Sequence, residues 1–305
     1  MIDYNPYEQP TKDTVCSWEG YLYFVYEREA VRIAKENGYK GELTNDQVLH
    51  DYRFTNIRRR DDRMTQWMIK NLIKPNEQRM DLWFTMLIAR LINWPPTLQA
   101  LITAHVIPCK PEDFNAIKFS EVIELQKKVQ RVVYGDAYLV YPTMKEPGSK
   151  KSYSMAKYIL SDVIKKAPFI HSSLWEDEPN VERFVKAMST CFGISTFIGG
   201  QVGCDLSYSD SHLGNAVDIY SYAPLGPGSQ LGLNLLLGFK RNHSWSQTDF
   251  NSKLLEANEK VAEELDITDL TLHSIQNTMC EFSKYAQAVM QIKRPKRLYR
   301  SQTEY

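Results

Sequence analysis

Segments with apolar residues at helical spacing follow one another along most of this chain, and prolines and glycines separate them. Residues 17–37 repeat aromatic and apolar side chains before Gly38 and Gly41, which can end a helix. Residues 79–93 are strongly apolar and stop before Pro95-Pro96. Further helices are predicted over residues 155–166, 180–192, 196–206, 229–238, 247–264 and 271–291. This succession predicts a mainly α-helical fold.

Two other segments bear on the fold. Thr44-Asn45-Asp46 can cap a helix, and we expect that helix to run through the arginine-rich residues 53–63 as far as Ile73. Residues 132–141 are rich in Val and Tyr around Gly135-Asp136. That composition is compatible with a small β-hairpin.

The two ends of the chain differ in composition from its middle. Residues 1–16 are polar, contain two prolines and are expected to form an extended arm. Residues 293–305 begin with a basic run and are expected to form a basic C-terminal tail. The intervening residues 17–292 are long enough for one large helical domain.

Composition narrows the function classes. The chain has 305 residues, 37 basic and 37 acidic, so net charge alone does not indicate a nucleic-acid binder. Five scattered cysteines form neither a C-x-x-C pair nor a zinc spacing, so we expect reduced thiols and no metal site. No signal peptide, membrane-length apolar run, Walker loop or dinucleotide fingerprint is evident. The expected location is the cytoplasm, with no membrane partner.

Residues 53–63 contain five arginines and two aspartates within eleven positions. Arginine presents a rigid fork of donors that matches phosphate and carboxylate in a bidentate manner. If the segment is helical, Arg58 pairs with Asp62 one turn later, and one side carries Asn56, Arg59, Arg60 and Arg63. The segment therefore predicts a polyanion site with an acid beside it. An exposed helix laced with ion pairs has equal weight.

A second segment has the sequence of a tight turn into a helix, Gly226-Pro227-Gly228-Ser229. Free backbone N–H groups and the helix dipole at such a turn attract anions, as in helix-hairpin-helix DNA-binding modules. A simple turn between helices explains the same residues. The basic tail is a second candidate contact for DNA phosphates.

Two further segments combine acids with apolar neighbours. Asp205 lies four residues after Gln201 in an apolar helix, where a carboxylate must be paired or functional because burial of an unpaired charge is costly. Glu281, Lys284 and Tyr285 follow Cys280 in the last helix and place an acid, an amine and a phenol within one turn. An ordinary amphipathic helix also accounts for that pattern.

Four of these segments, in this order, resemble the α-glutamyl/putrescinyl-thymine pyrophosphorylase family of phage type, relatives of the helical domain of hydroxymethyluracil DNA kinases. The matching segments are Arg53-Phe54-Thr55-Asn56 with Arg58 and Asp62, Gln201 with Asp205-Leu206, Gly226-Pro227-Gly228 with Gly232-Leu233-Asn234, and Cys280-Glu281-Phe282 with Lys284-Tyr285. The chain departs from the pattern at Ser283, where the family carries an acid, and at Gln230-Leu231, where it carries a basic pair.

The resemblance implies a helical DNA-glycosylase-like catalytic domain over residues 17–292. It also implies a DNA hypermodification enzyme, in which an amino acid or polyamine displaces pyrophosphate from a modified thymine base in double-stranded DNA. The resemblance implies no definite cofactor, although a divalent metal can accompany pyrophosphate.

The residue types then suggest roles. The candidate bases are Asp205 first, then Asp62 and Glu281. The candidate ligands of substrate and pyrophosphate are Arg53, Asn56, Arg58, Arg59, Arg63, Gln201, Lys284 and Tyr285. The candidate DNA contacts are Gly226, Gly228, Ser229, Asn234, Lys293, Arg294, Lys296 and Arg297. The candidate base-stacking rings are Phe54, Trp67 and Tyr208. A glycosylase for a modified pyrimidine and a non-catalytic helical DNA-binding protein are the alternatives.

Overall fold

The computed structural model describes residues 5–108, 110–135, 145–175, 177–296 and 298. The chain divides into two compact units, which are described separately. Unit 1 consists of Met1–Asp62 and Tyr220–Glu304, and unit 2 consists mainly of Arg63–Ile219. The helices of unit 1 are α1 (Trp18–Glu36), α2 (Gln47–Asp51), α12 (Pro227–Leu236), α13 (Gln247–Leu265) and α14 (Leu272–Val289), with a 3₁₀ turn η1 (Arg59–Asp61).

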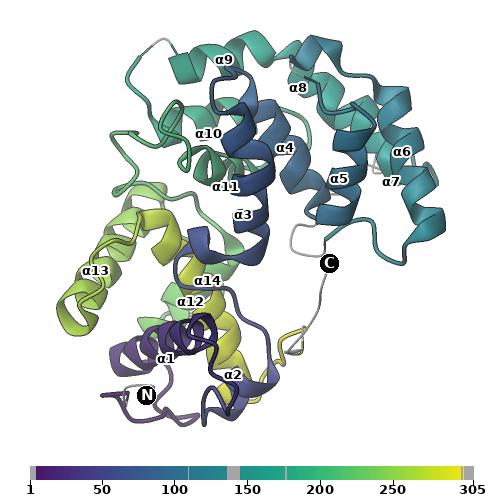
Figure 1. Cartoon of the computed structure of the whole chain (residues 1–305). Coiled ribbons are helices and arrows are strands. Elements are labelled where there is room, and N and C mark those ends of the chain that lie inside the picture. The colour runs from purple at the N-terminus through teal and green to yellow at the C-terminus, as the bar shows by residue number, and fades with distance from the viewer. Residues whose placement is uncertain (1–4, 109, 136–144, 176, 297, 299–305) are drawn as a thin grey trace. The chain divides into compact units, whose positions relative to one another are not determined.

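Unit 2 is helical as well. Its helices are α3 (Arg63–Met68), α4 (Leu82–Ile92), α5 (Pro95–Thr103), α6 (Ala116–Val129), α7 (Lys151–Ser154), α8 (Ser161–Lys165), α9 (Ala167–Trp175), α10 (Val181–Ser189) and α11 (Thr196–Leu206). The mainly α prediction is confirmed, and Figure 1 shows helices from both ends of the chain within unit 1. A glycosylase-like architecture stays a prediction. Within the described residues, no helix has the length and apolarity needed to cross a membrane.

The predicted β-hairpin falls mostly outside the described residues. Residues 132–135 form no strand, and residues 136–144 are not described. In the described part of the chain, the β pairing consists of one isolated antiparallel bridge between Tyr52 and Leu298.

The prediction of a continuous helix from residue 44 to Ile73 is wrong. Asp46 caps α2 as expected, but α2 ends at Asp51 and the backbone at Tyr52 and Arg58 is extended. Helix resumes only with η1 and α3. The reason is tertiary, because Arg28 of α1 donates from one nitrogen to the carbonyls of Phe54 (3.3 Å) and Thr55 (3.4 Å). These bonds satisfy carbonyls that a helix would otherwise use.

An aromatic cluster forms part of the core of unit 1. Phe24 lies 5.0 Å from Tyr285 and 5.8 Å from Phe54, measured between ring centroids. Tyr21 meets Phe282 edge-on at 5.3 Å. All five rings are buried. Helix α1, the segment after α2 and helix α14 are therefore held together mainly by the burial of these rings.

Helices α12 and α14 pack closely because α12 carries glycine at the contact. A Cβ at Gly232 would clash with the backbone oxygen of Met279, and a Cβ at Gly228 would clash with the Sγ of Cys280. Glycine is needed at these positions because it has no side chain and so allows the two helices to approach closely. The conformational freedom of glycine is not the reason.

Replacing Gly232 with Ala is expected to lower the free energy of unfolding by about 1–3 kcal/mol, because the clash is with backbone that cannot move alone. Chemical denaturation checks this. The matched control is Gly203→Ala in α11, where the new Cβ would lie 3.3 Å from a methyl carbon of Val181. There the gain in helix propensity should offset the mild crowding. Equal effects of the two substitutions would contradict this account of α12.

Candidate functional site

Residues 53–62 lie along α14, so that two of the predicted segments meet inside unit 1. Asn277 donates to the hydroxyl of Thr55 at 3.0 Å, and Thr278 donates to the carbonyl of Ile57 at 3.3 Å. The backbone N–H of Thr55 donates to Glu281 Oε2 at 3.3 Å. The arginine-rich segment is therefore a strip fixed on the surface of a helix; its backbone is extended up to Arg58 and ends in the η1 turn.

Asp62 organises the end of this strip. Its Oδ1 accepts from the backbone N–H of Asn56 at 2.9 Å, and its Oδ2 accepts from Arg59 at 3.1 Å. The side-chain amide of Asn56 donates to the carbonyl of Asp61 at 2.8 Å. Asn56, Arg59 and Asp62 are therefore brought together by a turn, whereas the sequence predicted a shared helical side for Asn56 and Arg59 and a pairing of Asp62 with Arg58.

Glu281 and Lys284 form an ion pair on the same side of α14. Lys284 Nζ donates to Glu281 Oε1 at 2.5 Å, and the side chains are 46% and 6% exposed respectively. Next to them, burial raises the pKa of the Cys280 thiol to about 11, helped by Glu281 and opposed by Lys284 and Arg59. Arg59 belongs to η1, which packs against α14. Cys280 is unsuited to act as a nucleophile because it stays protonated at neutral pH.

The predicted Arg58–Asp62 pair is wrong. Arg58 donates to both oxygens of Asp269, at 2.8 and 2.7 Å, and to Glu29 at 2.5 Å. Because the backbone at Arg58 is extended, the i,i+4 geometry of a helix does not exist there. Two carboxylates already engage the fork of Arg58, so its first role in this structure is to tie the strip to α1 and to the loop before α14.

Asp269→Asn tests this tie by its dependence on pH. The hydrogen bonds from Arg58 lower the pKa of Asp269 below its ordinary value. A depressed pKa contributes stability above the unfolded pKa of about 4, and that stability is lost as pH falls through the folded value. The variant should lose less than about 1 kcal/mol at pH 7, since the carboxylate is largely exposed, and nothing at about pH 2. The control is Asp13→Asn, an exposed aspartate of the N-terminal arm. A pH-independent loss in thermal unfolding would refute the linkage.

The Gly-Pro-Gly turn begins α12, and its side chains serve packing. Ser229 is fully buried, donates to the carbonyl of Gly226 at 3.0 Å and accepts from Gln276 at 3.2 Å. Asn234 is also buried and binds the loop that follows α12. That DNA contacts Gly226, Gly228, Ser229 and Asn234 stays a prediction. Because the side chains of Ser229 and Asn234 are buried, such contacts would have to involve the backbone of the turn.

Two of the predicted ligands and stacking residues belong to the core of unit 1. Phe54 is part of the aromatic cluster. Tyr285 is fully buried, and its hydroxyl donates to Asp46 at 2.6 Å. Burial raises the pKa of Tyr285, and the charge and hydrogen bond of Asp46 raise it further. Phe54 therefore anchors the strip by packing on Tyr285, and neither ring faces solvent.

A group of cations gathers at the start of the strip. Arg53 is exposed. Lys35 is exposed as a residue, but desolvation of its amine, followed by the charges of Arg28 and Arg53, lowers its pKa to about 8. The bridge between Tyr52 and Leu298 places one residue of the C-terminal tail, Leu298, next to the residue that precedes Arg53. Lys293, Arg294 and Lys296 of the tail are exposed, whereas Arg297 lies outside the described residues. Sequence reasoning missed Arg28 and Lys35, because only tertiary packing of α1 brings them to Arg53.

In unit 2, Asp205 forms a buried ion pair. Arg90 of α4 donates to both carboxylate oxygens, at 2.6 and 2.5 Å, and to the hydroxyl of Thr65 at 3.4 Å. The side chains of Arg90 and Asp205 are 2% and 0% exposed. The sequence required a partner or a function for Asp205, and the structure supplies the partner. Its role as a base stays a prediction.

The remaining predicted residues of unit 2 lie near these elements. Gln201 is buried on α11, one turn before Asp205. Tyr208 follows α11 and has its hydroxyl 3.4 Å from the thiol of Cys204. Trp67 is half-buried and Arg63 exposed, both on α3. Roles for these four residues in substrate binding stay predictions.

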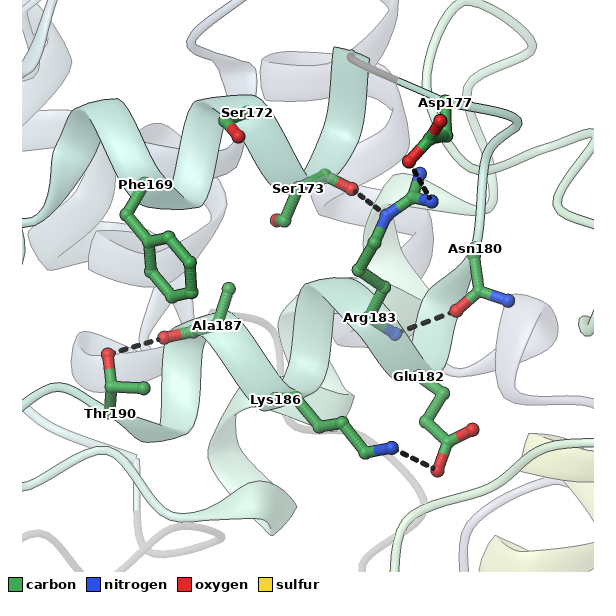
Figure 2. A pocket seen from close by; sticks show the side chains of 10 residues that line it. All are labelled: Phe169, Ser172, Ser173, Asp177, Asn180, Glu182, Arg183, Lys186, Ala187 and Thr190. Atoms are coloured by element: carbon green, nitrogen blue, oxygen red, sulfur yellow. Dashed lines mark hydrogen bonds and ion pairs between the residues drawn. The ribbon is translucent and has the colours of Figure 1, made fainter.

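A cavity of about 440 Å³ in unit 2 lies between α9 and α10 (Figure 2). Figure 2 shows Arg183 directed toward the carbonyl of Ser173 and toward Asp177, to which it donates at 2.8 and 3.2 Å. Lys186 pairs with Glu182 at the rim. The cavity contains none of the residues that the sequence singled out, and its charged side chains bind one another.

No grouping of three or more His, Cys, Asp or Glu suited to a metal ion occurs in the part of the chain that the structure describes. The family model described as 5-hmdU DNA kinase, helical domain, matches residues 16–294. The chain therefore belongs to this family of helical domains, which confirms the relation inferred from its motifs. Neither a curated protein nor a solved structure matches it.

Proposed function

We propose that this protein modifies a 5-hydroxymethyluracil base in DNA, displacing pyrophosphate from its exocyclic carbon with an amine. The observation that carries the proposal is that the strip, which contains Arg59 and Asp62, binds Glu281 of α14 through the N–H of Thr55. Lys284 pairs with the same Glu281, and residues 16–294 match a family named for a DNA kinase of this base. Anion-binding groups and a carboxylate are what such a displacement requires.

The proposed step balances as a substitution. The amine nitrogen attacks the exocyclic methylene carbon, the bond from that carbon to the pyrophosphate oxygen breaks, and pyrophosphate leaves with the electron pair. Glu281 takes the proton released from the attacking nitrogen. Arg53, Arg59 and Lys284 offset the charge on the departing pyrophosphate, with which a divalent cation can enter. We assign the base to Glu281 because its partner Lys284 is 46% exposed, whereas Asp205 and its partner Arg90 are both buried.

Mass spectrometry of nucleosides tests the activity. DNA carrying pyrophosphorylated hydroxymethyluracil is incubated with the protein and a pool of amino acids and polyamines. The expected products are a nucleoside bearing the amine and one equivalent of pyrophosphate, absent from a reaction without protein. Retention of the pyrophosphorylated nucleoside would overturn the proposal.

A non-catalytic DNA-binding role is a second candidate. It is favoured by the internal pairing of Asp62, Asp205 and Glu281 with Arg59, Arg90 and Lys284. A binder would hold the modified DNA without releasing pyrophosphate, and the same experiment with a binding measurement separates the two roles.

Affinity for duplex DNA is expected to fall with added salt, because phosphate contacts release counterions. Replacing Lys293, Arg294 and Lys296 together with Gln should flatten the plot of log affinity against log salt by roughly 0.9 for each phosphate that the tail no longer neutralises. The control is the replacement of Lys127 and Lys128 on α6 with Gln. An unchanged slope for the tail variant would exclude the tail from the interface.

A further inference from the structure

Three rings pack together on one surface loop, residues 238–246, which joins α12 to α13. Phe239 and His243 are stacked, with ring centroids 4.6 Å apart and planes 14° from parallel. Trp245 meets both rings edge-on, at 5.4 Å from Phe239 and 4.9 Å from His243. None of these residues has a role in the proposed reaction.

Asn234 holds the loop in this shape. Its side-chain amide donates to the carbonyls of His243 at 2.8 Å and Arg241 at 3.3 Å, while its oxygen accepts from the indole N–H of Trp245 at 2.7 Å. All three bonds come from one buried side chain of α12. The rings are therefore ordered before any ligand arrives, which reduces the entropy lost on binding.

The three rings differ in what they contact. Trp245 packs against the core of unit 1 and anchors the loop. Phe239, by contrast, is 46% exposed, and His243 is exposed. The indole of Trp245 is therefore explained by its role in anchoring the loop. That role does not explain why the two stacked rings of Phe239 and His243 face solvent.

The charge of the loop has one sign. Residues 238–246 include Lys240 and Arg241 and no acidic residue. Arg241 is fixed by a 2.7 Å bond to Gln287 of α14, and Lys240 is exposed. Exposed rings beside cations are the combination that binds a nucleic-acid strand, since bases stack on the rings and phosphates meet the cations.

We propose that residues 238–246 form a stacking platform for an unpaired base of a DNA strand, with Phe239 and His243 under the base and Lys240 at an adjacent phosphate. The platform rests on the proposed function only in taking DNA as the polymer. An enzyme that acts on a base must take it out of the duplex, and a platform that holds unpaired bases favours the opened strand.

Fluorescence anisotropy with the full chain tests the platform on ordinary thymine DNA, without modified base or amine. The probes are a single-stranded oligonucleotide and the matching paired duplex. Phe239→Leu removes the aromatic face and is expected to weaken binding of the single strand roughly tenfold, with little change for the duplex. His243→Ala should act in the same direction. Lys240→Ala should reduce the slope of log affinity against log salt by about 0.7, the value for one phosphate of a single strand.

The matched control is Phe169→Leu, another exposed phenylalanine on α9. Circular dichroism establishes that each variant is folded. The platform is overturned if the single strand does not bind, if Phe239→Leu and His243→Ala bind it as the unchanged chain does, or if RNA of the same sequence binds more tightly. If binding depends on Phe239 but no amine is transferred, the platform stands and the proposed reaction is rejected. If amine is transferred but the loop variants bind the single strand as the unchanged chain does, the reaction stands and the platform is rejected.

Discussion

Replacing Asp205 with Asn is expected to lower the free energy of unfolding by about 3–5 kcal/mol, the loss typical when one member of a buried ion pair is removed. The guanidinium of Arg90 is 2% exposed and directs two hydrogen bonds at this carboxylate. Asparagine keeps the shape but leaves a buried charge without its counter-charge. Urea denaturation of the full chain measures the effect.

Two variants sharpen that test. Arg90→Met combined with Asp205→Leu removes both charges together and should recover most of the stability, because neither charge is left buried alone. Glu182→Gln breaks the exposed pair with Lys186 and should cost less than about 1 kcal/mol. If Asp205→Asn is as stable as the unchanged chain, the ion pair is not a support of unit 2. Loss of amine transfer in that stable variant would then return the base to Asp205.

The second large effect concerns turnover. Glu281→Gln is expected to reduce amine transfer by roughly 10²–10⁴-fold, because the amide cannot accept the proton of the attacking amine. Binding of the modified DNA should persist. The fold should survive, since Gln can still accept from the backbone N–H of Thr55, and Lys284 is 46% exposed and can be solvated.

The matched control for this carboxylate is Glu27→Gln on α1. Glu27 lies in the same unit and accepts from the hydroxyl of Thr44 at 2.6 Å and from the amide of Asn5 at 3.1 Å. Its replacement should leave turnover within about threefold, a change too small to remove a proton-transfer step. Transfer at full rate in Glu281→Gln would contradict the assignment and leave Asp62 as the next carboxylate to test by Asp62→Asn.

Local patterns were sufficient to predict most of the helices. Helix α11 has the predicted bounds, and α13 and α14 differ from theirs by one or two residues. These helices have apolar residues at helical spacing and a Ser or Thr cap whose side chain accepts a backbone N–H, and both signals are local. The order of the four family segments likewise indicated the family before any coordinates.

The arginine-rich segment shows where local reasoning failed. Its composition allows helix, but Arg28 on α1 and Asp62 bind its backbone and hold it extended along α14. Tertiary hydrogen bonds outweighed helix propensity, which amounts to less than about 1 kcal/mol per residue. The same tertiary contacts decided the partners of the charged side chains: Asp269 and Glu29 for Arg58, and Arg90 for Asp205.

The sequence therefore predicted which residue types belong to the candidate site. It did not predict which of their side chains are buried or already bound to other residues. Sequence alone indicated that Asp205 needed a partner, that the Gly-Pro-Gly turn begins a helix, and that Glu281 and Lys284 share one turn of α14. Only the tertiary structure placed Ser229, Asn234 and Tyr285 in the interior and packed η1, which contains Arg59, against α14. The physical reason is that helix formation depends on neighbours within a few residues, whereas burial and ion pairing depend on groups far apart along the chain.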